Sequence, residues 1–269
     1  MTNAGSEENK ERKDWRYVCQ DCDFVTMGVN YASDHEDAER HTNNAQSTVQ
    51  REGSRVRLVA ISDTHTLHNS LVLPEGDVLI HAGDGTSSGN MEQTKNWAAW
   101  MREQAKRFKY VVVIGGNHDF SLEHFMREGC EELVHEMFYP AYYLRDESLH
   151  IEGKNFYGSP WQPRFFDWAF NADRGPDIAQ HWAKIPQGTD VLITHGPPMG
   201  ILDWVGKERV GCADLRVVVE DIQPQVHIFG HIHGGYGVQK QNGTEYYNAA
   251  LLNDAYTHPW YRKPWVIDL

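Results

Sequence analysis

Seven side chains of this chain are of the types that bind divalent metal ions, and they stand directly after apolar runs. They are Asp63, His65, Asp84, Asn117, His195, His231 and His233. Mixed carboxylate and imidazole ligands suit Mn, Fe, Zn or Ni better than Ca or Mg alone. Two such ions held ~3.5–4 Å apart can bind both the attacking and the leaving oxygen of a displacement at phosphorus. The residue types therefore predict a two-metal centre for phosphate-ester chemistry.

The apolar runs before these residues have the length of buried strands and predict how the side chains come together. The runs are Val56–Ile61, Val78–Ile80, Val111–Ile114, Val191–Ile193 and Val226–Phe229. From Arg55 onward such runs alternate with helix-like segments, which is typical of an α/β fold. In an open α/β sheet the loops after the strands converge on one crevice. We therefore expect one α/β domain over residues 55–269, with the seven residues gathered at the strand ends.

Hydrophobic spacing and turn residues predict the other elements of this domain. Helices are expected at Glu92–Lys109, at Ser121–Met137 with Ser121 as a cap, and at Leu215–Ile222, which stops before Pro224. A strand is expected at Ile151–Tyr157, and short strands over Tyr236–Leu269 with a hairpin turn at Asn242–Gly243. Cys130 and Cys212 stand alone and are expected to be buried or half-buried hydrophobic residues.

The same residues resemble a known signature. It comprises Asp63-x-His65, Gly83-Asp84, Gly116-Asn117-His118-Asp119, His195 and Gly230-His231-x-His233. In this order they resemble the calcineurin-like metallophosphoesterases. Further stretches resemble the cyclic-nucleotide phosphodiesterase-like subfamily of metallophosphoesterase-domain-containing proteins, namely Gly158-Ser159-Pro160-Trp161, Thr194-His195-Gly196-Pro197-Pro198, Asp203-Trp204-Val205 and Val210-Gly211-Cys212. The resemblance covers roughly residues 57–269.

The resemblance implies a four-layer α/β/β/α sandwich and a division of the ligands between two divalent ions. One ion takes Asp63, His65, Asp84 and His233, and the other takes Asp84, Asn117, His195 and His231. A hydroxide that bridges the ions attacks phosphorus, since coordination lowers the pKa of water. His118 lies beside the ions and stabilises phosphate oxygens or protonates the leaving group, with Asp119 orienting its ring. Gly85 departs from the family, where a bulkier residue is common, so a looser loop is expected there.

Aromatic and basic residues near the predicted crevice suggest a substrate pocket. The aromatic residues are Trp161, Phe165, Phe166, Trp168 and Trp204, and the basic ones are Arg164, Arg174 and Arg209. The rings fit a stacking surface for a nucleobase and fit equally well as packing beneath long loops. The arginines fit phosphate contacts or a solvated surface. Trp161, Arg164, Trp204 and Arg209 are taken as the substrate-binding candidates.

The other histidines carry no supporting motif and are expected to be ordinary packed or surface residues. They are His68, His81, His124, His135, His150, His181, His227 and His258. His68 is the one whose position soon after the first motif could bring it near the pocket.

The N-terminal region has a separate pattern. Cys19, Cys22, His35 and His41 have the spacing of a Cys2His2 zinc finger. We predict a disordered tail over residues 1–14, a structural zinc module over 15–45 and a linker over 46–54; an exposed Cys pair in a flexible arm is the alternative. Acidic residues outnumber basic ones between the first Cys and the last His, which disfavours DNA reading. A protein partner or a purely structural role suits this module better.

Composition limits the classes of function. The net charge of −13 over 269 residues opposes broad binding to nucleic-acid backbones. No run of 18 apolar residues is present and the first residues are polar, so we expect a soluble, cytoplasmic protein without a membrane span or signal peptide. The four cysteines do not form a disulfide framework.

These observations predict a dinuclear metal-dependent phosphodiesterase that hydrolyses small nucleotide diesters such as cyclic nucleotides. A phosphomonoesterase or protein phosphatase on the same scaffold is the second hypothesis, because the ligand set cannot separate the two. A non-catalytic binding protein is a third hypothesis, and the complete ligand set argues against it. A nuclease is disfavoured by the acidic charge.

Overall fold

The computed structural model describes residues 16–18, 25–27, 55–258 and 262–269. The chain divides into two compact units, Met1–Gly53 and Ser54–Leu269. In the first unit, β1 (Arg16–Val18) pairs antiparallel with β2 (Val25–Met27). The predicted tail, the linker and the four predicted zinc ligands, Cys19, Cys22, His35 and His41, lie outside the described residues. The zinc module therefore stays a prediction.

One sheet of the second unit carries the first three predicted strands. Its order is β17 (Trp265–Asp268), β3 (Arg57–Ile61), β4 (Val78–His81), β5 (Tyr110–Val113) and β6 (Tyr142–Tyr143). The strands from β3 to β6 run parallel, and β17 is antiparallel to β3. The carboxyl ends of β3, β4 and β5 therefore lie along one edge, as the sequence predicts.

The second sheet carries the other two predicted strands. Its order is β15 (Gly237–Gln241), β16 (Thr244–Asn248), β14 (Val226–Phe229), β11 (Val191–Thr194), β8 (Lys154–Ser159) and β7 (Glu147–Ile151). The four central strands are parallel. The predicted hairpin turn is confirmed between β15 and β16, where Asn242 (φ 51°) and Gly243 (φ 90°) have the positive φ angles of a type I′ turn.

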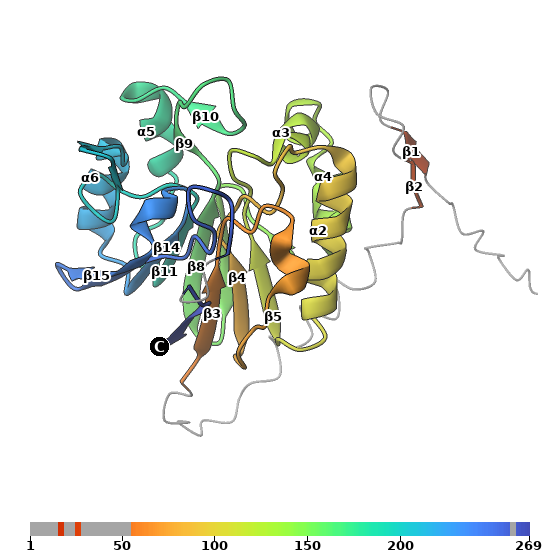
Figure 1. Ribbon diagram of the computed structural model, residues 1–269, viewed down its shortest axis with the longest axis horizontal. Coiled ribbons are helices and arrows are strands. Elements are labelled where there is room, and N and C mark those ends of the chain that lie inside the picture. The colour runs from red at the N-terminus through yellow and green to blue at the C-terminus, as the bar shows by residue number, and fades with distance from the viewer. Residues whose placement is uncertain (1–15, 19–24, 28–54, 259–261) are drawn as a thin grey trace, which may run out of the picture. The chain divides into compact units, whose positions relative to one another are not determined.

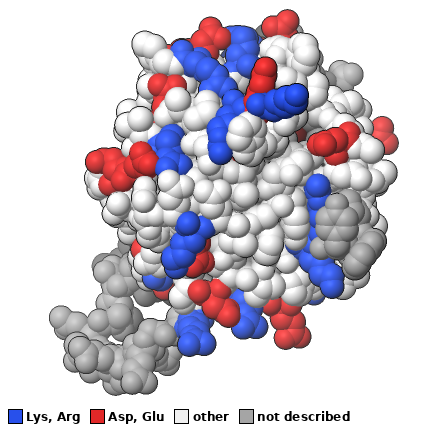
Figure 2. Space-filling model, turned by 60° about the vertical axis from the view of Figure 1, so that its left-hand side comes forward, with Lys and Arg blue, Asp and Glu red and all other residues white. Residues whose placement is uncertain are grey.

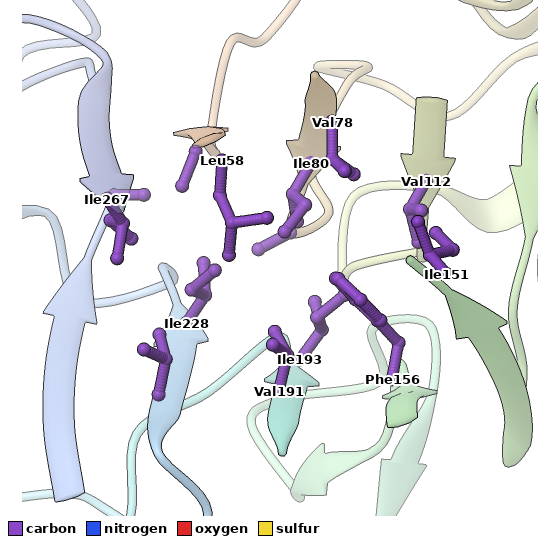
Figure 3. Close-up of a cluster of buried hydrophobic side chains, with 14 of the residues drawn as sticks. Leu58, Val78, Ile80, Val112, Ile151, Phe156, Val191, Ile193, Ile228 and Ile267 are labelled. Atoms are coloured by element: carbon purple, nitrogen blue, oxygen red, sulfur yellow. The ribbon is translucent and has the colours of Figure 1, made fainter. Parts of the chain in front are cut away.

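The two sheets pack face to face. Leu58, Ile80 and Val112 of the first sheet share one buried cluster with Ile193 and Ile228 of the second (Figure 3). Strands buried on both faces need near-continuous apolar runs, and this explains why the five runs stand out in the sequence.

Helices cover the outer face of each sheet. On one side lie α2 (Met91–Gln104), α3 (Phe120–Arg127) and α4 (Glu131–Phe138), and on the other α5 (Pro176–Trp182) and α6 (Ala213–Ile222) (Figure 1). Trp182 of α5 and Leu215 of α6 share a buried cluster with Leu192 and Phe229. The layers follow the expected order helix, sheet, sheet, helix. No helix within the described residues is long and apolar enough to cross a membrane.

Short elements lie in the loops between these layers. They are η1 (Leu67–Ser70), β9 (Gln162–Pro163), β10 (Asn171–Ala172), β12 (Trp204–Val205), β13 (Glu208–Arg209) and η2 (His233–Gly235).

Two helix predictions differ from the structure. The single helix expected over Ser121–Met137 is interrupted between α3 and α4, where Gly129 has a φ of 69°. A glycine in the left-handed region commonly ends a helix. Ser121 does not cap α3, because it lies inside the helix and donates to the carbonyl of Gly89 at 2.6 Å. The helix α2 ends at Gln104, before the predicted Lys109.

Gly85 lies in a tightly packed loop, which corrects the expectation of a looser one. A Cβ atom at this position would lie 2.0 Å from the indole of Trp97. Trp97, on α2, is fully buried. Its ring thus fills the space that a bulkier side chain at position 85 would need.

We expect Gly85→Ala to lower the free energy of unfolding by about 1–3 kcal/mol through overpacking. Gly85→Ala combined with Trp97→Leu should be more stable than the sum of the two single changes, because the smaller side chain admits the added methyl group. Urea denaturation of the four proteins measures this coupling. Gly237→Ala is the control, since the added methyl there has only ordinary contacts. Additive effects at positions 85 and 97 would contradict the packing account.

Asp146 joins the strand layer to α5 through four hydrogen bonds. Its Oδ1 accepts from Ser159 at 2.7 Å. Its Oδ2 accepts from Trp161 at 3.2 Å, from Lys184 at 2.8 Å and from His181 at 3.1 Å. Burial raises the pKa of this carboxyl, but these partners outweigh burial and lower it to about 2.

We expect Asp146→Asn to lower the free energy of unfolding by about 2–3 kcal/mol at neutral pH. The substitution puts a donating N–H₂ group where Oδ2 now accepts three hydrogen bonds. Asn also tolerates the positive φ of 57° at this position. The folded-state pKa is depressed, so the contribution is present above the unfolded value of about 4 and is lost as pH falls toward 2. The difference between variant and wild type should therefore shrink below about pH 4. Asp173→Asn removes an exposed ion pair with Arg164 and should change stability little at any pH, because solvent screens the pair. A pH-independent difference for Asp146→Asn would contradict this account.

Candidate metal centre and cavity

Backbone hydrogen bonds tie the strand-end loops of both sheets together. The N–H of Asp63 donates to the carbonyl of Gly83 at 3.0 Å, and that of Gly230 donates to His195 at 2.9 Å. The N–H of Ser62, after β3, donates to Ala249, after β16, at 2.9 Å. The last bond joins the two sheets beside the predicted ligands, so all seven side chains meet in one place.

The first group of acceptor atoms forms around His65 and His233. Nδ1 of His65 donates to the carbonyl of Thr86 at 3.0 Å, and Nδ1 of His233 donates to that of Asn253 at 2.9 Å. These bonds assign the tautomers, so each Nε2 carries a lone pair. The two Nε2 atoms lie 3.2 Å apart. Two lone pairs at this distance repel unless a positive charge lies between them.

Carboxylates complete this group. Oδ1 of Asp63 lies 3.2 Å from Nε2 of His233. Oδ2 of Asp84 lies 3.8 Å from Nε2 of His65. When both rings are neutral, four acceptors therefore converge without a matching donor, and a metal cation or a proton on His233 would supply the positive charge that this group favours.

The second group forms around Asn117. Its Oδ1 lies 2.9 Å from Nε2 of His195 and 2.7 Å from Nδ1 of His231. Nδ1 of His195 donates to the carbonyl of Ala82 at 2.9 Å, which leaves its Nε2 as an acceptor when the ring is neutral. Oδ2 of Asp84 lies 3.4 Å from that same Nε2. The donor set again suits a transition metal ion.

Asp84 belongs to both groups. Its Oδ1 accepts the backbone N–H of His118 at 2.8 Å. Its Oδ2 is thereby left between His65 and His195, at 3.8 and 3.4 Å. This position suits a bridging carboxylate. Within the described residues, three groups of side chains could each hold a metal ion, and their members are Asp63, His65 and His233; Asp63, Asp84 and His195; and His65, Asp84 and His118. The predicted division of ligands between two ions stays a prediction.

The electrostatics of the buried ligands call for positive charge. Burial raises the pKa of Asp63, but the hydrogen bond and charge of His233 outweigh it and hold the pKa well below its usual range. Burial lowers the pKa of His195, but Asp84 and Asp63 raise it to about 9. Burial lowers the pKa of His231 to about 3, so this ring is neutral. Protons or metal cations can supply the charge that the carboxylates favour.

Four of the seven residues have a strained backbone. Asp63, His65, Asp84 and His231 have φ angles of 52°, 39°, 56° and 64°. This left-handed region costs free energy for residues other than glycine, and such strain clusters at functional sites. The tight turns aim the side chains inward.

Two glycines next to the ligands are required by close contact. A Cβ at Gly116 would lie 2.4 Å from Oδ1 of Asp84, and one at Gly230 would lie 2.0 Å from Oδ2 of Asp63. Any larger residue would displace a ligand. This explains why glycine precedes Asn117 and His231.

His118 stands beside the metal groups, and Asp119 does not orient it. Nδ1 of His118 donates to the carbonyl of Ser87 at 2.6 Å. Its ring lies 4.6 Å from that of His65. The predicted role of Asp119 is wrong: its carboxylate accepts backbone N–H bonds, including those of Asp84 and Gly116 at 2.9 and 2.8 Å. Asp119 holds two ligand loops, and Ser87 holds the ring.

A cavity of about 510 Å³ opens next to the two groups. Asp84, Asn117, His118, His231 and His233 form part of its lining. Phe165, Trp168 and Trp204 among the predicted aromatic residues, and Arg164 and Arg174 among the predicted basic ones, line it as well. Its volume is that of a site for a small ligand.

Trp161, Phe166 and Arg209 are not part of this lining. The indole of Trp161 stacks on His181 at 3.9 Å, which favours the packing alternative for this residue. Arg209 lies over the ring of Trp204 at 4.3 Å and donates to Asp203 at 2.7 Å. His68 contacts Asn96 at 2.8 Å rather than the cavity.

Tyr256 lines the cavity and was missed by the sequence analysis. Its ring lies 4.8 Å from that of His65 and 5.3 Å from that of His233. The turn that presents it is organised by Asn253, whose Oδ1 accepts the N–H of Thr257 at 3.0 Å. No motif in the C-terminal stretch signals this role, because it depends on the fold of the turn.

Comparisons with known proteins agree with this geometry. Residues 56–235 match the family model described as calcineurin-like phosphoesterase. The chain is similar to metallophosphoesterase domain-containing protein 1 of Homo sapiens, with 40% identity over 237 residues that cover 79% of this chain and 71% of that protein. It is also similar to UPF0046 protein K07C11.7 of Caenorhabditis elegans, with 38% identity over 209 residues that cover 74% and 70%.

Proposed function

The chain belongs to the calcineurin-like phosphoesterase family, and on that premise we propose that it is a two-metal phosphodiesterase that hydrolyses small nucleotide diesters such as cyclic nucleotides. The observation that carries the proposal is the pair of Nε2 lone pairs of His65 and His233, which face each other at 3.2 Å. Oδ2 of Asp84 lies between this pair and His195.

The side chains divide into two ligand sets that share Asp84. Asp63, His65 and His233 would complete one set, and Asn117, His195 and His231 the other. Ions such as Mn, Fe, Zn or Ni, when bound, lower the pKa of water and neutralise charge on phosphate oxygens. Hydrogen bonds from Nδ1 to a backbone carbonyl orient the rings of His65, His195 and His233 as ligands.

His118 supplies the proton that the leaving group needs. Its Nδ1–H is engaged by the carbonyl of Ser87, so Nε2 is the ring nitrogen that can exchange a proton with a substrate. His118 lines the cavity beside Asp84 and Asn117. A proton donated from Nε2 leaves the departing alkoxide neutral.

The cavity walls support a diester rather than a monoester. A diester carries one negative charge and two organic groups, whereas a monoester carries up to two charges and one organic group. Phe165, Trp168, Trp204 and Tyr256 offer ring surfaces for a base or sugar. Of the two arginines in the lining, Arg164 is already paired with Asp173. The apolar walls thus suit the organic groups more than a dianion.

The surface charge supports a small substrate rather than long nucleic acid. On the face shown in Figure 2, Lys and Arg side chains are interspersed with Asp and Glu around a wide uncharged area. The net charge is −13. Backbone recognition of a polynucleotide needs clustered basic residues.

A hydrolysis screen tests the proposal. It compares 2′,3′- and 3′,5′-cyclic nucleotides, linear dinucleotides and phosphomonoesters with Mn²⁺ added, using His231→Ala as the matched negative control. We expect cyclic or linear diesters to be hydrolysed fastest and the variant to be inactive. Faster turnover of monoesters would favour the phosphomonoesterase alternative. No turnover of any ester would favour a binding protein.

A further inference from the structure

Two buried histidines that carry no motif each contact a threonine beside the candidate ligands. His81 ends β4, and its Nε2 lies 2.9 Å from Oγ1 of Thr64. His227 lies on β14, and its Nε2 lies 2.8 Å from Oγ1 of Thr194. Both histidines are fully buried. One pair therefore occurs in each sheet, and both threonines lie near the strand ends where the metal groups form.

The threonines are covalent neighbours of three candidate ligands. Thr64 stands between Asp63 and His65, and Thr194 directly precedes His195. Asp63 and His65 both have positive φ angles, of 52° and 39°. A hydroxyl held from the adjacent strand fixes the orientation of the peptide units on either side of it.

The bond between His227 and Thr194 has a defined direction. The hydroxyl of Thr194 donates its single hydrogen to the carbonyl of Gly196 at 2.8 Å. Nε2 of His227 must therefore donate to this hydroxyl, which assigns the proton to Nε2. The imidazole thus anchors the turn between β11 and Gly196, where His195 projects.

Stability alone does not explain these histidines. Nδ1 of His81 and Nδ1 of His227 are buried without a hydrogen-bond partner among the described residues. Burial lowers the pKa of each ring to about 3, so both are neutral. A buried polar atom without a partner is destabilising, and an apolar side chain of similar size would avoid it.

We propose that His81 and His227 are positioning residues that set the affinity of the two ligand groups through Thr64 and Thr194. The inference rests on the proposed metal-dependent function. The rings do not reach the ligand groups themselves; they hold the turns from which Asp63, His65 and His195 project. Substitution of residues that support a metal ligand without contacting the metal commonly weakens metal affinity by about 10–100-fold.

Calorimetric titration of metal-free protein with Mn²⁺ tests this inference, together with thermal unfolding of the same metal-free samples. The variants are His81→Leu, His227→Leu and His227→Gln, because glutamine retains a donor near the place of Nε2. His68→Leu is the matched control: His68 is also buried with an unpartnered Nδ1, but its Nε2 contacts Asn96 of α2.

We expect about 10–100-fold weaker Mn²⁺ binding for both leucine variants at positions 81 and 227. Affinity should be near the wild-type value for His227→Gln and His68→Leu. The melting temperature of metal-free His227→Leu should be unchanged or higher, because the hydroxyl of Thr194 keeps its bond to the carbonyl of Gly196. Wild-type affinity in His81→Leu and His227→Leu would overturn the inference, as would an equal loss in His68→Leu. Absence of Mn²⁺ uptake by the wild type would instead contradict the proposed function, and the inference with it.

Discussion

Asp84→Asn is expected to reduce the turnover of a phosphodiester by about 1,000-fold or more, because one carboxylate serves both metal groups. The shared oxygen, Oδ2, lies 3.8 Å from Nε2 of His65 and 3.4 Å from Nε2 of His195. In the variant an N–H₂ group can take its place and donate to these lone pairs. The site would then be satisfied by its own hydrogen bonds, and its affinity for cations would fall.

This variant separates metal binding from folding. Oδ1 of the asparagine can still accept the N–H of His118, as Oδ1 of Asp84 does at 2.8 Å. We therefore expect metal-free Asp84→Asn to remain folded and to unfold in one cooperative transition, with a melting temperature lowered only by loss of the ion pair between Asp84 and His195. Turnover of bis-p-nitrophenyl phosphate measures the loss of activity, and Mn²⁺ titration measures the loss of cation affinity.

Asp268→Asn is the control for the Asp84 prediction. Asp268 forms an exposed ion pair with Arg57 at 2.8 Å. Exposed pairs contribute little to stability because water and salt screen them, and this pair is at the opposite end of β3 from Asp63. Turnover by Asp84→Asn at the rate of this control would rule out the assignment of Asp84.

His118→Asn is expected to cause the second-largest loss of turnover, and the size of this loss should depend on the leaving group of the substrate. Loss of a general acid commonly lowers a rate by about 100–10,000-fold. Asparagine places an N–H₂ near the position of Nδ1, so the bond to Ser87 can persist while Nε2 is removed. A substrate with an alkoxide leaving group should therefore slow markedly.

p-Nitrophenolate departs without a proton, so bis-p-nitrophenyl phosphate should be much less affected by His118→Asn. Rates for a series of diesters with leaving groups of increasing pKa measure this dependence, with His124→Asn on α3 as the control. Mn²⁺ stoichiometry should match the wild type, since His118 is outside the two proposed ligand sets; a lost ion would instead assign His118 as a ligand beside His65 and Asp84. Equal rate loss for all leaving groups would contradict a role in proton transfer and favour a contact to the phosphate oxygens.

The meeting of the seven side chains could be predicted because two independent signals coincide. The runs before Asp63, Asp84 and His195 are apolar at nearly every position, which is the pattern of strands buried on both faces. Carboxylate and imidazole residues follow at the carboxyl ends, where loops converge. Neither signal depends on details of packing, so the strand ends and the ligand types could be read from local sequence.

Residues whose role depends on loop packing could not be predicted in the same way. Asp119 follows His118 directly, yet its carboxylate turns toward the backbone of Gly116 and Asp84. Trp161 lies within a recognised motif but packs on His181, whereas Tyr256 lies in no motif and lines the cavity. These side chains are directed by contacts between distant segments, which short-range patterns do not encode.

The paired histidines behind the ligands give another example of this limit. His81 and His227 were expected to be ordinary packed residues, and their burial agrees with that expectation. Their bonds to Thr64 and Thr194 become visible only when neighbouring strands are placed in register. A hydroxyl beside a ligand and an imidazole on the next strand form a pattern that could be sought in other chains of this architecture.

Anomalous diffraction from crystals grown with Mn²⁺ tests the central claim most directly. The account predicts two peaks on opposite sides of Oδ2 of Asp84, ~3.5–4 Å apart, as in two-metal hydrolytic sites. One peak should lie among Asp63, His65 and His233, and the other among Asn117, His195 and His231. A single peak, or peaks away from Asp84, would contradict it.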